Sequence, residues 1–303
     1  MQETETTTNN YFRSLKQALD GDLYSDILHR LLYATDASAY REIPAAVALP
    51  RSKDDIKKLI RFAREHKTTL IPRTAGTSLA GQVVGNGIVV DVSKHMNDVL
   101  EINAKEKWIR VQPGVVLDEM NQILKPYGLF FAPETSTGNR CMIGGMVGNN
   151  SCGLHSLIYG STREHTLSVH CILSDGSEAV FHEISKETFQ KKCNIDKLEG
   201  EIYRNIRDIL SSKENQENIR REYPHYQVPR RNTGYAIDVM LETEPFAKND
   251  KPFNFAKFIA GSEGTLAFIT EIKLNLIPLP PPVKAAIPVH CPSVEAALHA
   301  NLV

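Results

Sequence analysis

Three separated loops of this sequence are rich in glycine and small polar residues, a composition that often surrounds a ligand. The first is PRTAGTSLAGQVVGNG, residues 72–87. Its residues without bulky side chains let several backbone N–H groups converge on an anion, and its threonine and serine hydroxyls add further donors. The loop therefore predicts the binding of a group such as a diphosphate. A tight crossover whose glycines only relieve steric clashes is the alternative.

Two well-known phosphate-binding loops do not fit this stretch. A P-loop has a lysine directly after its second glycine, and Gln82 stands at that position. A dinucleotide-binding G-x-G-x-x-G motif opens a helix, whereas Gly85 and Gly87 lead directly into the strand-like run IVVDV. What remains is a loop between two strands that could cradle an anion.

The second and third loops show the same composition. In APETSTGNRCMIGGMVGNNSCGLHSLIYGSTRE, residues 132–164, closely spaced glycines permit the approach of a flat or phosphorylated ligand. An irregular surface loop is the alternative, although the apolar residues among these glycines favour burial. In AGSEGTLAFITE, residues 260–271, Ser262 is expected to cap a helix, and a plain turn is the alternative.

At these three loops the sequence resembles the FAD-binding domain of the vanillyl-alcohol oxidase and p-cresol methylhydroxylase flavoproteins, over roughly residues 45–278. The first loop is similar to P-R-G-G-G-T-S, which holds the FAD pyrophosphate in that family, with Thr74 and Ala75 replacing two glycines. The second is similar to the flavin-lining P-[DE]-P-S…I-G-G-x-x-x-x-N-x-G-G. The third is similar to G-S-E-G-T-L-G-I-I-T-E, with Ala267 and Phe268 as substitutions. Three such motifs in the same order make the resemblance highly specific.

The loops and the resemblance together imply a set of FAD-binding residues. The set comprises Arg73, Thr74, Ala75, Gly76, Thr77, Ser78, Leu79, Pro133, Glu134, Thr135, Ser136, Gly138, Ile143, Gly144, Gly145, Gly148, Asn149, Asn150, Ser151, Gly153, Tyr159, Gly160, Glu263, Gly264, Thr265 and Ile269. Non-covalent FAD is expected, because the first loop has no histidine or cysteine for flavin attachment. Cys152 and His155, in the second loop, match no attachment motif.

Within that family the sequence resembles the D-2-hydroxyacid dehydrogenases, especially long members with a C-terminal iron-sulfur module, in NNSCGLHSLIYGSTREH and VPRRNTGYAID. The resemblance implies oxidation of a D-2-hydroxyacid, such as D-lactate, glycolate or D-2-hydroxyglutarate, by hydride transfer to flavin N5. Electrons would pass to a separate acceptor, a quinone, a cytochrome or an electron-transfer protein. The chain is expected to be truncated before its substrate domain. The catalytic base, and any metal or iron-sulfur cluster, are therefore expected beyond Val303.

Other functions on the same flavin domain stay open. One is an NADPH-using reductase, like the enzyme that reduces a peptidoglycan precursor, and another is a non-catalytic FAD-binding electron-transfer subunit. The local candidates for binding an acidic substrate are Arg230, Arg231, Asn232 and Tyr235. A solvated basic turn is the alternative for them.

The elements around these loops predict an α+β protein with a two-subdomain FAD-binding fold. A helix SKDDIKKLIRFAREH between short β-branched strands indicates a small βαβ subdomain. Later hairpins, the second turning on Asp175-Gly176, indicate a larger, mostly antiparallel sheet flanked by helices. The small subdomain is expected to pack against this sheet.

The expected divisions of the chain follow from these elements. Residues 1–42 form a helical lead-in, with Asp22 capping its second helix; residues 43–94 form FAD-binding subdomain 1 and residues 95–278 subdomain 2. Residues 279–303 follow a proline-rich boundary and are expected to begin the substrate domain with one strand and a helix.

Composition excludes several classes of function. The 303 residues carry 35 Lys and Arg against 36 Asp and Glu, so nothing favours nucleic acid or an anionic membrane as partner. The five cysteines form no C-x-x-C pair and suit a reducing compartment, and the ten histidines show no ligand spacing, so no metal site is expected here. No secretory signal or transmembrane run is visible, and a cytoplasmic protein is expected, with a peripheral position at the inner membrane face as the alternative.

Overall fold

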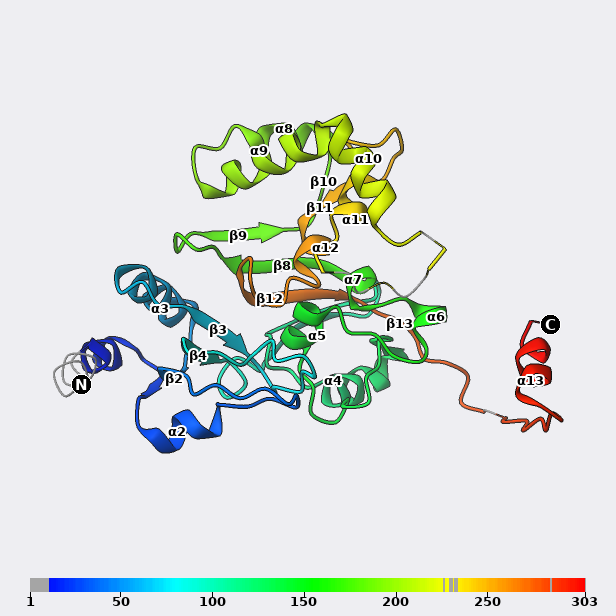
Figure 1. Ribbon diagram of the computed structural model, residues 1–303, viewed down its shortest axis with the longest axis horizontal. Coiled ribbons are helices and arrows are strands. Elements are labelled where there is room, and N and C mark those ends of the chain that lie inside the picture. Colours follow the sequence, from blue (N-terminus) through cyan, green and yellow to red (C-terminus); the bar gives the residue numbers. More distant parts are fainter. Residues whose placement is uncertain (1–10, 226, 229–230, 232–233, 284, 303) are drawn as a thin grey trace.

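Two β-sheets with helices around them make up the protein, whose computed structural model describes residues 11–225, 227–228, 231, 234–283 and 285–302. Figure 1 shows the smaller sheet at the lower left, the larger sheet above it and a layer of helices on top. The predicted α+β fold, with a small subdomain packed against a larger antiparallel sheet, is confirmed. The domain boundaries stay a prediction.

The smaller sheet has the strand order β1-β2-β4-β3. Its strands are β1 (Asp22–Tyr24), β2 (Ala46–Leu49), β3 (Leu70–Arg73) and β4 (Ile88–Asp91). Strands β2, β4 and β3 run parallel, and β1 pairs antiparallel with β2 at the edge. Helix α3 (Lys53–Glu65) connects β2 to β3, so the predicted βαβ unit is present.

Helix α3 begins where the sequence predicts. The Ser52 hydroxyl accepts the Asp55 N–H, which satisfies one of the free donors of the first turn. The buried Asp55 carboxylate accepts N–H groups of Asp20 and Gly21 as well as of Arg51. Asp55 thereby fixes the segment that precedes β1 against the start of α3.

The N-terminal segment differs from the expectation. Residues 11–18 are helical, but the prediction that Asp22 caps a second helix is wrong, because Asp22 begins strand β1. Pairing with β2 buries Leu23 opposite Ala48 in the smaller core, which a helix at this place would not do. The next helix, α2 (Ile27–Leu32), starts five residues later and is capped by Asp26, whose carboxylate accepts the His29 N–H.

The larger sheet is antiparallel throughout, in the order β5-β6-β12-β8-β9. Its strands are β5 (Val99–Asn103), β6 (Trp108–Val111), β8 (Thr166–Ile172), β9 (Glu178–Phe181) and β12 (Phe268–Asn275). Two sequence hairpins, β5-β6 and β8-β9, thus flank β12, which arrives from the far end of the chain. Residues Ile172 and Phe268 of this sheet also belong to the core of the smaller subdomain, so the two units share a packed interface.

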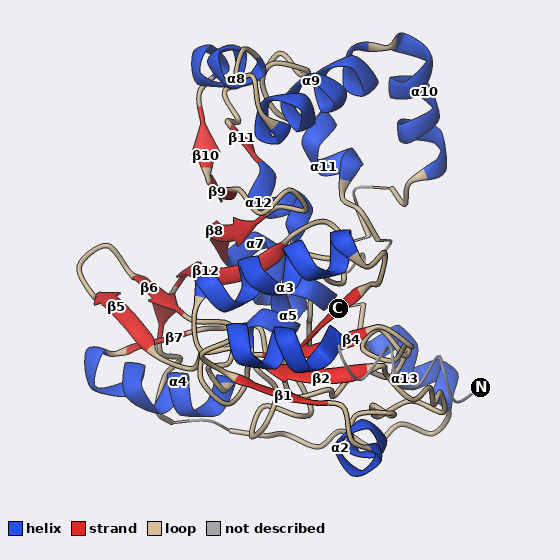
Figure 2. Ribbon diagram, turned by 90° about the vertical axis from the view of Figure 1, so that its left-hand side faces the viewer, coloured by secondary structure: helices blue, strands red, loops and turns tan. Residues whose placement is uncertain are grey.

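Helices cover the larger sheet, in agreement with the prediction of a sheet flanked by helices. Figure 2 shows α8 (Lys186–Cys193), α9 (Leu198–Ser211) and α10 (Lys213–Glu222) stacked above it with α11 (Ile237–Leu241) and α12 (Phe255–Ile259). The short pair β10 (Glu183–Ile184) and β11 (Phe253–Asn254) links this lobe to the sheet. Aromatic side chains, among them Phe189, Tyr203 and Phe253, pack edge to face in its core.

The remaining elements lie around the second loop and at the C-terminal end. Helix α4 (Leu117–Leu124) continues into the 3-10 turn η1 (Lys125–Tyr127), and β7 (Leu129–Phe130) pairs with β13 (Ile277–Pro278). The second loop contains α5 (Ile143–Asn149), α6 (Ser156–Tyr159) and α7 (Thr162–His165). The expected late helix is α13 (Val294–Ala300), which lies apart from the body in Figure 1; no strand precedes it among the described residues from 279 to 292.

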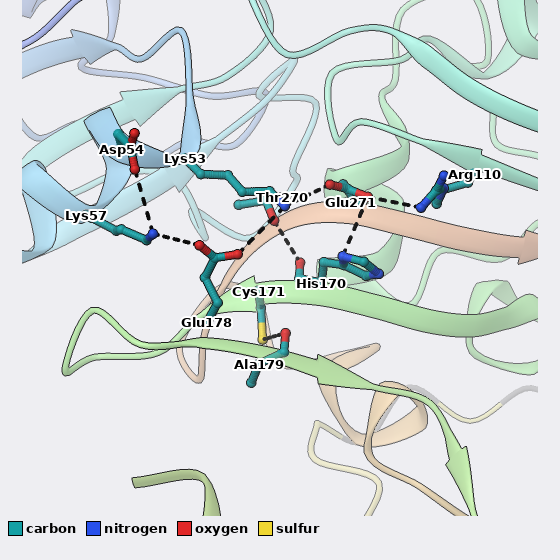
Figure 3. A network of polar contacts seen from close by, with 10 residues as sticks. All are labelled: Lys53, Asp54, Lys57, Arg110, His170, Cys171, Glu178, Ala179, Thr270 and Glu271. Atoms are coloured by element: carbon teal, nitrogen blue, oxygen red, sulfur yellow. Dashed lines mark hydrogen bonds and ion pairs between the residues drawn. The ribbon is translucent and has the colours of Figure 1, made fainter. Parts of the chain in front are cut away.

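A network of ion pairs joins α3 to the larger sheet (Figure 3). The Glu271 carboxylate on β12 lies 2.8 Å from the Lys53 ammonium of α3, 3.8 Å from the Arg110 guanidinium and 3.5 Å from the His170 ring. On β9, Glu178 approaches Lys57 of α3 at 2.6 Å. The Glu271 side chain is 17% exposed and that of Glu178 is 49% exposed, so Glu271 is the better shielded of the two carboxylates that connect α3 to the larger sheet.

Stability should fall as this network is acidified. Burial alone would raise the pKa of Glu271, but the hydrogen bond from Lys53 and the neighbouring cations outweigh it and hold that pKa below its usual value. The contribution of Glu271 is therefore complete above about pH 4.5 and is lost as pH falls through its folded pKa. Burial lowers the pKa of His170, with Lys53 and Arg110 acting in the same direction against Glu271 and Glu178, so protonating this ring on acidification also destabilises the fold.

Urea unfolding of wild type and Glu271→Gln across pH 3 to 8 measures this effect. We expect the variant to be less stable by about 1–2 kcal/mol at pH 7, because a mostly buried charged hydrogen bond is lost. The difference should shrink toward zero at the acid end. If the difference in unfolding free energy between wild type and Glu271→Gln stayed constant with pH, the charge of Glu271 would not be what stabilises this contact.

Candidate functional site

The first loop lies against both of the other glycine-rich loops. A Cβ atom added to Gly145 would sit 2.7 Å from the Thr74 hydroxyl, so the second loop approaches the first as closely as a glycine allows. A Cβ atom on Gly264 would sit 3.3 Å from the Pro72 ring, so the third loop also contacts the first. Segments about 70 and 190 residues apart in sequence therefore meet at the carboxyl end of β3.

The second and third loops are joined by backbone hydrogen bonds. The N–H of Gly261 donates to the Val147 carbonyl and the N–H of Glu263 donates to the Gly148 carbonyl, both at 2.9 Å. Both acceptors belong to helix α5, which Figure 1 shows beside β12. The three loops thus close into a ring.

A cavity of about 930 Å³ lies inside this ring. Most of the residues that the sequence analysis assigned to FAD line it. These are Arg73, Thr74, Ala75, Gly76, Thr77, Ser78, Leu79, Thr135, Ser136, Gly144, Gly145, Gly148, Asn149, Ser151, Glu263, Gly264 and Ile269. The structure therefore brings the three sequence motifs to one place, and their contact with FAD stays a prediction.

The other residues of that set do not line the cavity. They are Pro133, Glu134, Gly138, Ile143, Asn150, Gly153, Tyr159, Gly160 and Thr265. Several of them shape the loops instead. Ile143 is fully buried in the larger core, Asn150 accepts hydrogen bonds from the Ser161 hydroxyl and the Arg163 N–H, and Gly153 packs so closely on Glu134 that a side chain there would strike the Glu134 carbonyl.

The first loop is built to leave its backbone donors free. Gly76 has φ +68°, in the left-handed region that glycine tolerates, and a Cβ atom there would lie 2.8 Å from the guanidinium carbon of Arg73. In the part of the chain that the structure describes, no protein acceptor receives the backbone N–H groups of residues 74–79. An array of free N–H groups against a cavity is the arrangement that binds an anion.

Arg73 holds the N-terminal segment at the edge of this cavity. Its guanidinium donates to the Thr35 carbonyl at 2.9 Å and lies over the Tyr33 ring, whose hydroxyl donates to Asp91. Burial lowers the pKa of Arg73, against the nearby charge of Asp91 and Asp36. Arg73 thus connects the N-terminal segment to the first loop and also lines the cavity.

This link explains the lining residues that the sequence analysis missed. They include Leu32, Thr35, Asp36 and Ala37 from the N-terminal segment, Pro113 from the connection between β6 and α4, and Gln82, Arg140, Cys141 and Cys152 from the loops. The N-terminal residues carry no glycine cluster, and only a contact with the first loop brings them into the site. Burial raises the pKa of Cys141, so this thiol stays neutral beside the cavity.

The third loop is a turn, which corrects the expectation of a helix start. Helix α12 ends at Ile259, before the motif, and the buried Ser262 donates its N–H to the Ile259 carbonyl. Gly261 and Gly264 both have positive φ, at +100° and +76°, so the chain reverses direction here and enters β12. Glu263, at φ +54°, and Gly264 are consecutive residues in the left-handed region, which is incompatible with a helix beginning at Ser262.

The buried side chain of Arg163 stabilises this turn through hydrogen bonds to backbone carbonyls. The side chain is 7% exposed, and its guanidinium donates to the carbonyls of Ala260, Lys257 and Gly234. A Cβ atom on Gly261 would lie 2.5 Å from it, so the turn rests directly on the guanidinium. The second and third loops are therefore cross-linked by a buried cation as well as by the backbone.

The described candidates for substrate binding, Arg231 and Tyr235, do not line the cavity. Arg230 and Asn232 fall outside the described residues. Arg231 is engaged with Asp238 at 2.6 Å and does not line the cavity. The Tyr235 hydroxyl lies 2.7 Å from that of Thr265, beside the third loop. Of the described candidates, only Tyr235 lies next to a cavity-forming loop.

The two departures from the glycine-rich motif should be functionally neutral. Neither Thr74 nor Ala75 has positive φ, so neither backbone conformation requires glycine. Thr74 packs toward Gly145 and Ala75 lines the cavity. We expect Thr74→Gly/Ala75→Gly to keep its FAD affinity within about threefold, measured by flavin fluorescence titration, since no described hydrogen bond is lost. Loss of FAD from the double variant would show that the Thr74 hydroxyl is a required ligand.

Known proteins are similar to this chain in sequence and in fold. Residues 44–181 match the family model described as an FAD binding domain. The chain is similar to D-2-hydroxyglutarate dehydrogenase of Haemophilus influenzae, with 38% identity over 93% of this chain, and of Escherichia coli, with 36% identity over 95%. It spans 27% and 28% of the length of these two relatives.

Solved structures show the same architecture. An alkyldihydroxyacetonephosphate synthase is similar to 90% of this chain and 44% of its own, with a TM-score of 0.59 and 18% sequence identity. The 6-hydroxy-D-nicotine oxidase of Arthrobacter nicotinovorans is similar to 86% of this chain and 43% of its own, with a TM-score of 0.55 and 15% identity. At these identities the likeness establishes the fold alone.

None of the helices in the described ranges combines the length and apolar character needed to cross a membrane. Over the same residues, His, Cys, Asp and Glu side chains form no group of three or more that could hold a metal ion.

Proposed function

We propose that this chain is the cofactor-binding part of an FAD-dependent oxidoreductase, because its residues 44–181 match the family model described as an FAD binding domain. The observation that carries the proposal is the closure of three glycine-rich loops around a single cavity of about 930 Å³. Small-molecule sites span roughly 300–1,000 Å³, so this one suits a ligand as large as a dinucleotide.

The polar groups around the cavity also suit FAD. The free N–H groups of residues 74–79 match the oxygens of a diphosphate, which only accept hydrogen bonds. Two lining residues carry a buried acceptor for which the described residues provide no donor, Oδ2 of Asp36 and Oε1 of Gln82. A phosphate cannot satisfy an acceptor, but the hydroxyls and N–H groups of FAD can.

Bound FAD would supply a flavin ring able to take a hydride at N5. The part played by this chain is binding and orientation. We assign the diphosphate to the first loop, and the flat ring to the second loop, where Gly144, Gly145 and Gly148 leave room for close approach. Attachment is proposed to be non-covalent.

The proposed substrate is a D-2-hydroxyacid such as D-lactate, glycolate or D-2-hydroxyglutarate. The support is the similarity of 36–38% identity, over most of this chain, to proteins named D-2-hydroxyglutarate dehydrogenase. The α-carbon would lose a hydride to the flavin and its hydroxyl would lose a proton to a base, which leaves a 2-oxoacid. We propose that this base, and any metal or iron-sulfur cluster, lie outside residues 1–303. A separate acceptor then takes the electrons, and we place the reaction in the cytoplasm, or at the inner face of the membrane.

Anaerobic reduction of the bound flavin tests the proposal. A protein that contains this chain, loaded with FAD, should bleach at about 450 nm when D-2-hydroxyglutarate, D-lactate or the achiral glycolate is added. L-2-hydroxyglutarate and L-lactate should be inactive. Bleaching by NADPH but by no hydroxyacid would instead establish a nicotinamide-dependent reductase. A flavin reduced by neither would point to a non-catalytic electron-transfer role.

A further inference from the structure

Among the described residues, Gln82 is the one side chain of the first loop that hydrogen-bonds to both of the other loops. Its amide nitrogen donates to Oδ1 of Asn149, in the second loop, at 3.2 Å and to Oε1 of Glu263, in the third, at 3.1 Å. Because both partners are acceptors, the nitrogen must face them, and the orientation of the amide is fixed. All three residues also line the cavity.

The position of these bonds is at the surface of the site. Asn149 and Glu263 are exposed, and so are Leu79 and Ala80, which precede Gln82 at the tip of the first loop. The tip of the first loop is therefore attached to the second and third loops through the side-chain amide of Gln82. The attachment lies at an exposed edge of the cavity, which we call its mouth.

The partner Glu263 is held in an unfavourable conformation. Its φ of +54° places a residue with a side chain in the left-handed region, which costs about 1 kcal/mol. Its N–H bond to Gly148 and its side-chain bond from Gln82 both act to keep it there. Releasing Gln82 would remove one of these two restraints, so the amide also steadies the third loop.

We propose that Gln82 is a strap that retains FAD: its amide bridges the three loops across the cavity mouth and must detach before the cofactor leaves. The proposal rests on the proposed function, since it takes FAD as the occupant. It makes Gln82 a positioning residue, whose effect falls on the rate of release. Gln82 is also the residue that stands where a P-loop would have its lysine.

A double-mutant cycle on the release rate tests the strap. We would load the chain with FAD, start release by rapid dilution, and follow the recovery of flavin fluorescence for wild type, Gln82→Leu, Glu263→Ala and the double variant. Gln82→Leu should release FAD about tenfold faster, equivalent to about 1.4 kcal/mol, while the association rate changes less than threefold. The double variant should be no faster than Gln82→Leu within a factor of two, because both changes break the same bridge.

Gln216→Leu is the matched control. Gln216 donates its amide to the Leu210 carbonyl at 2.7 Å in the helical lobe, away from the cavity, so its loss removes an amide hydrogen bond of the same kind. This variant should release FAD at the wild-type rate. The melting temperature of each cofactor-free variant separates a loss of the strap from a general loss of stability.

Three results would overturn the inference. They are an unchanged release rate in Gln82→Leu, rates in the double variant that are the product of the two single effects, or a faster release explained by a matching fall in the cofactor-free melting temperature. Each of these can occur while wild type binds FAD, in which case the proposed function stands without the strap. A wild type that takes up no FAD would end both proposals.

Discussion

A Gly76→Val variant is expected to retain no FAD after gel filtration while it keeps its fold. Two features of the structure combine at this position. The backbone is in the left-handed region, at φ +68°, and a new Cβ atom would strike the Arg73 guanidinium. The side chain can be accommodated only if the loop moves, and movement scatters the free N–H groups that we assign to the diphosphate.

Gly128 supplies a control with the same strain. It also has φ +68°, but a Cβ atom there would meet nothing within 4 Å, and it lies outside the cavity at the end of η1. Gly128→Val and Gly76→Val should each lose about 1–2 kcal/mol of stability from the backbone conformation alone. Only Gly76→Val should lose FAD. Wild-type FAD occupancy in Gly76→Val would refute the assignment of the first loop.

Arg163→Met is expected to cause the largest loss of stability, about 3 kcal/mol in urea unfolding. The guanidinium satisfies the carbonyls of Lys257, Ala260 and Gly234 in a site that is almost fully buried, and methionine fills the volume without donating. Carbonyls left unsatisfied in a buried place cost about 1–3 kcal/mol in total, and the charge-assisted bonds are lost as well. The turn that carries Gly261 should also loosen, which weakens FAD binding.

Arg204→Met is the control for this prediction. Arg204 likewise donates to two backbone carbonyls, those of Cys193 and Ile195, but it does so in the helical lobe. Its loss should lower stability with no change in FAD affinity. If Arg163→Met binds FAD as tightly as Arg204→Met does, the third loop is not part of the site.

The sequence was informative wherever a local rule decides the structure. Ser52 and the apolar spacing of the following residues predict α3, and the turn at Asp175-Gly176 predicts the β8-β9 hairpin, because capping and turn formation involve only neighbouring residues. The three glycine-rich loops could be assigned to one ligand because together, and in this order, they resemble the motifs of one family. The contacts between the loops, such as that of Gly145 with Thr74, could not be predicted from the sequence, but they agree with the assignment of all three loops to one ligand.

The expectations that were wrong depend on distant contacts. Leu23 suits a helix by its spacing, but pairing with Ala48 in β2 offers it a buried place in a strand. Asp36 carries no motif and reaches the cavity only because Arg73 binds the carbonyl next to it. Asn150 belongs to a recognisable motif, yet its side chain orders the backbone at Ser161 and Arg163. In such cases tertiary packing overrides the local pattern.

Calorimetric titration of the purified, cofactor-free chain with FAD tests the central claim most directly. If the ring of three loops is an FAD site, one FAD should bind per chain, and the bound flavin should show a shifted visible spectrum. The stoichiometry should fall to zero in Gly76→Val and stay at one in Gly128→Val. A folded wild-type chain that binds no FAD, or a Gly76→Val variant that binds one equivalent, would contradict the account.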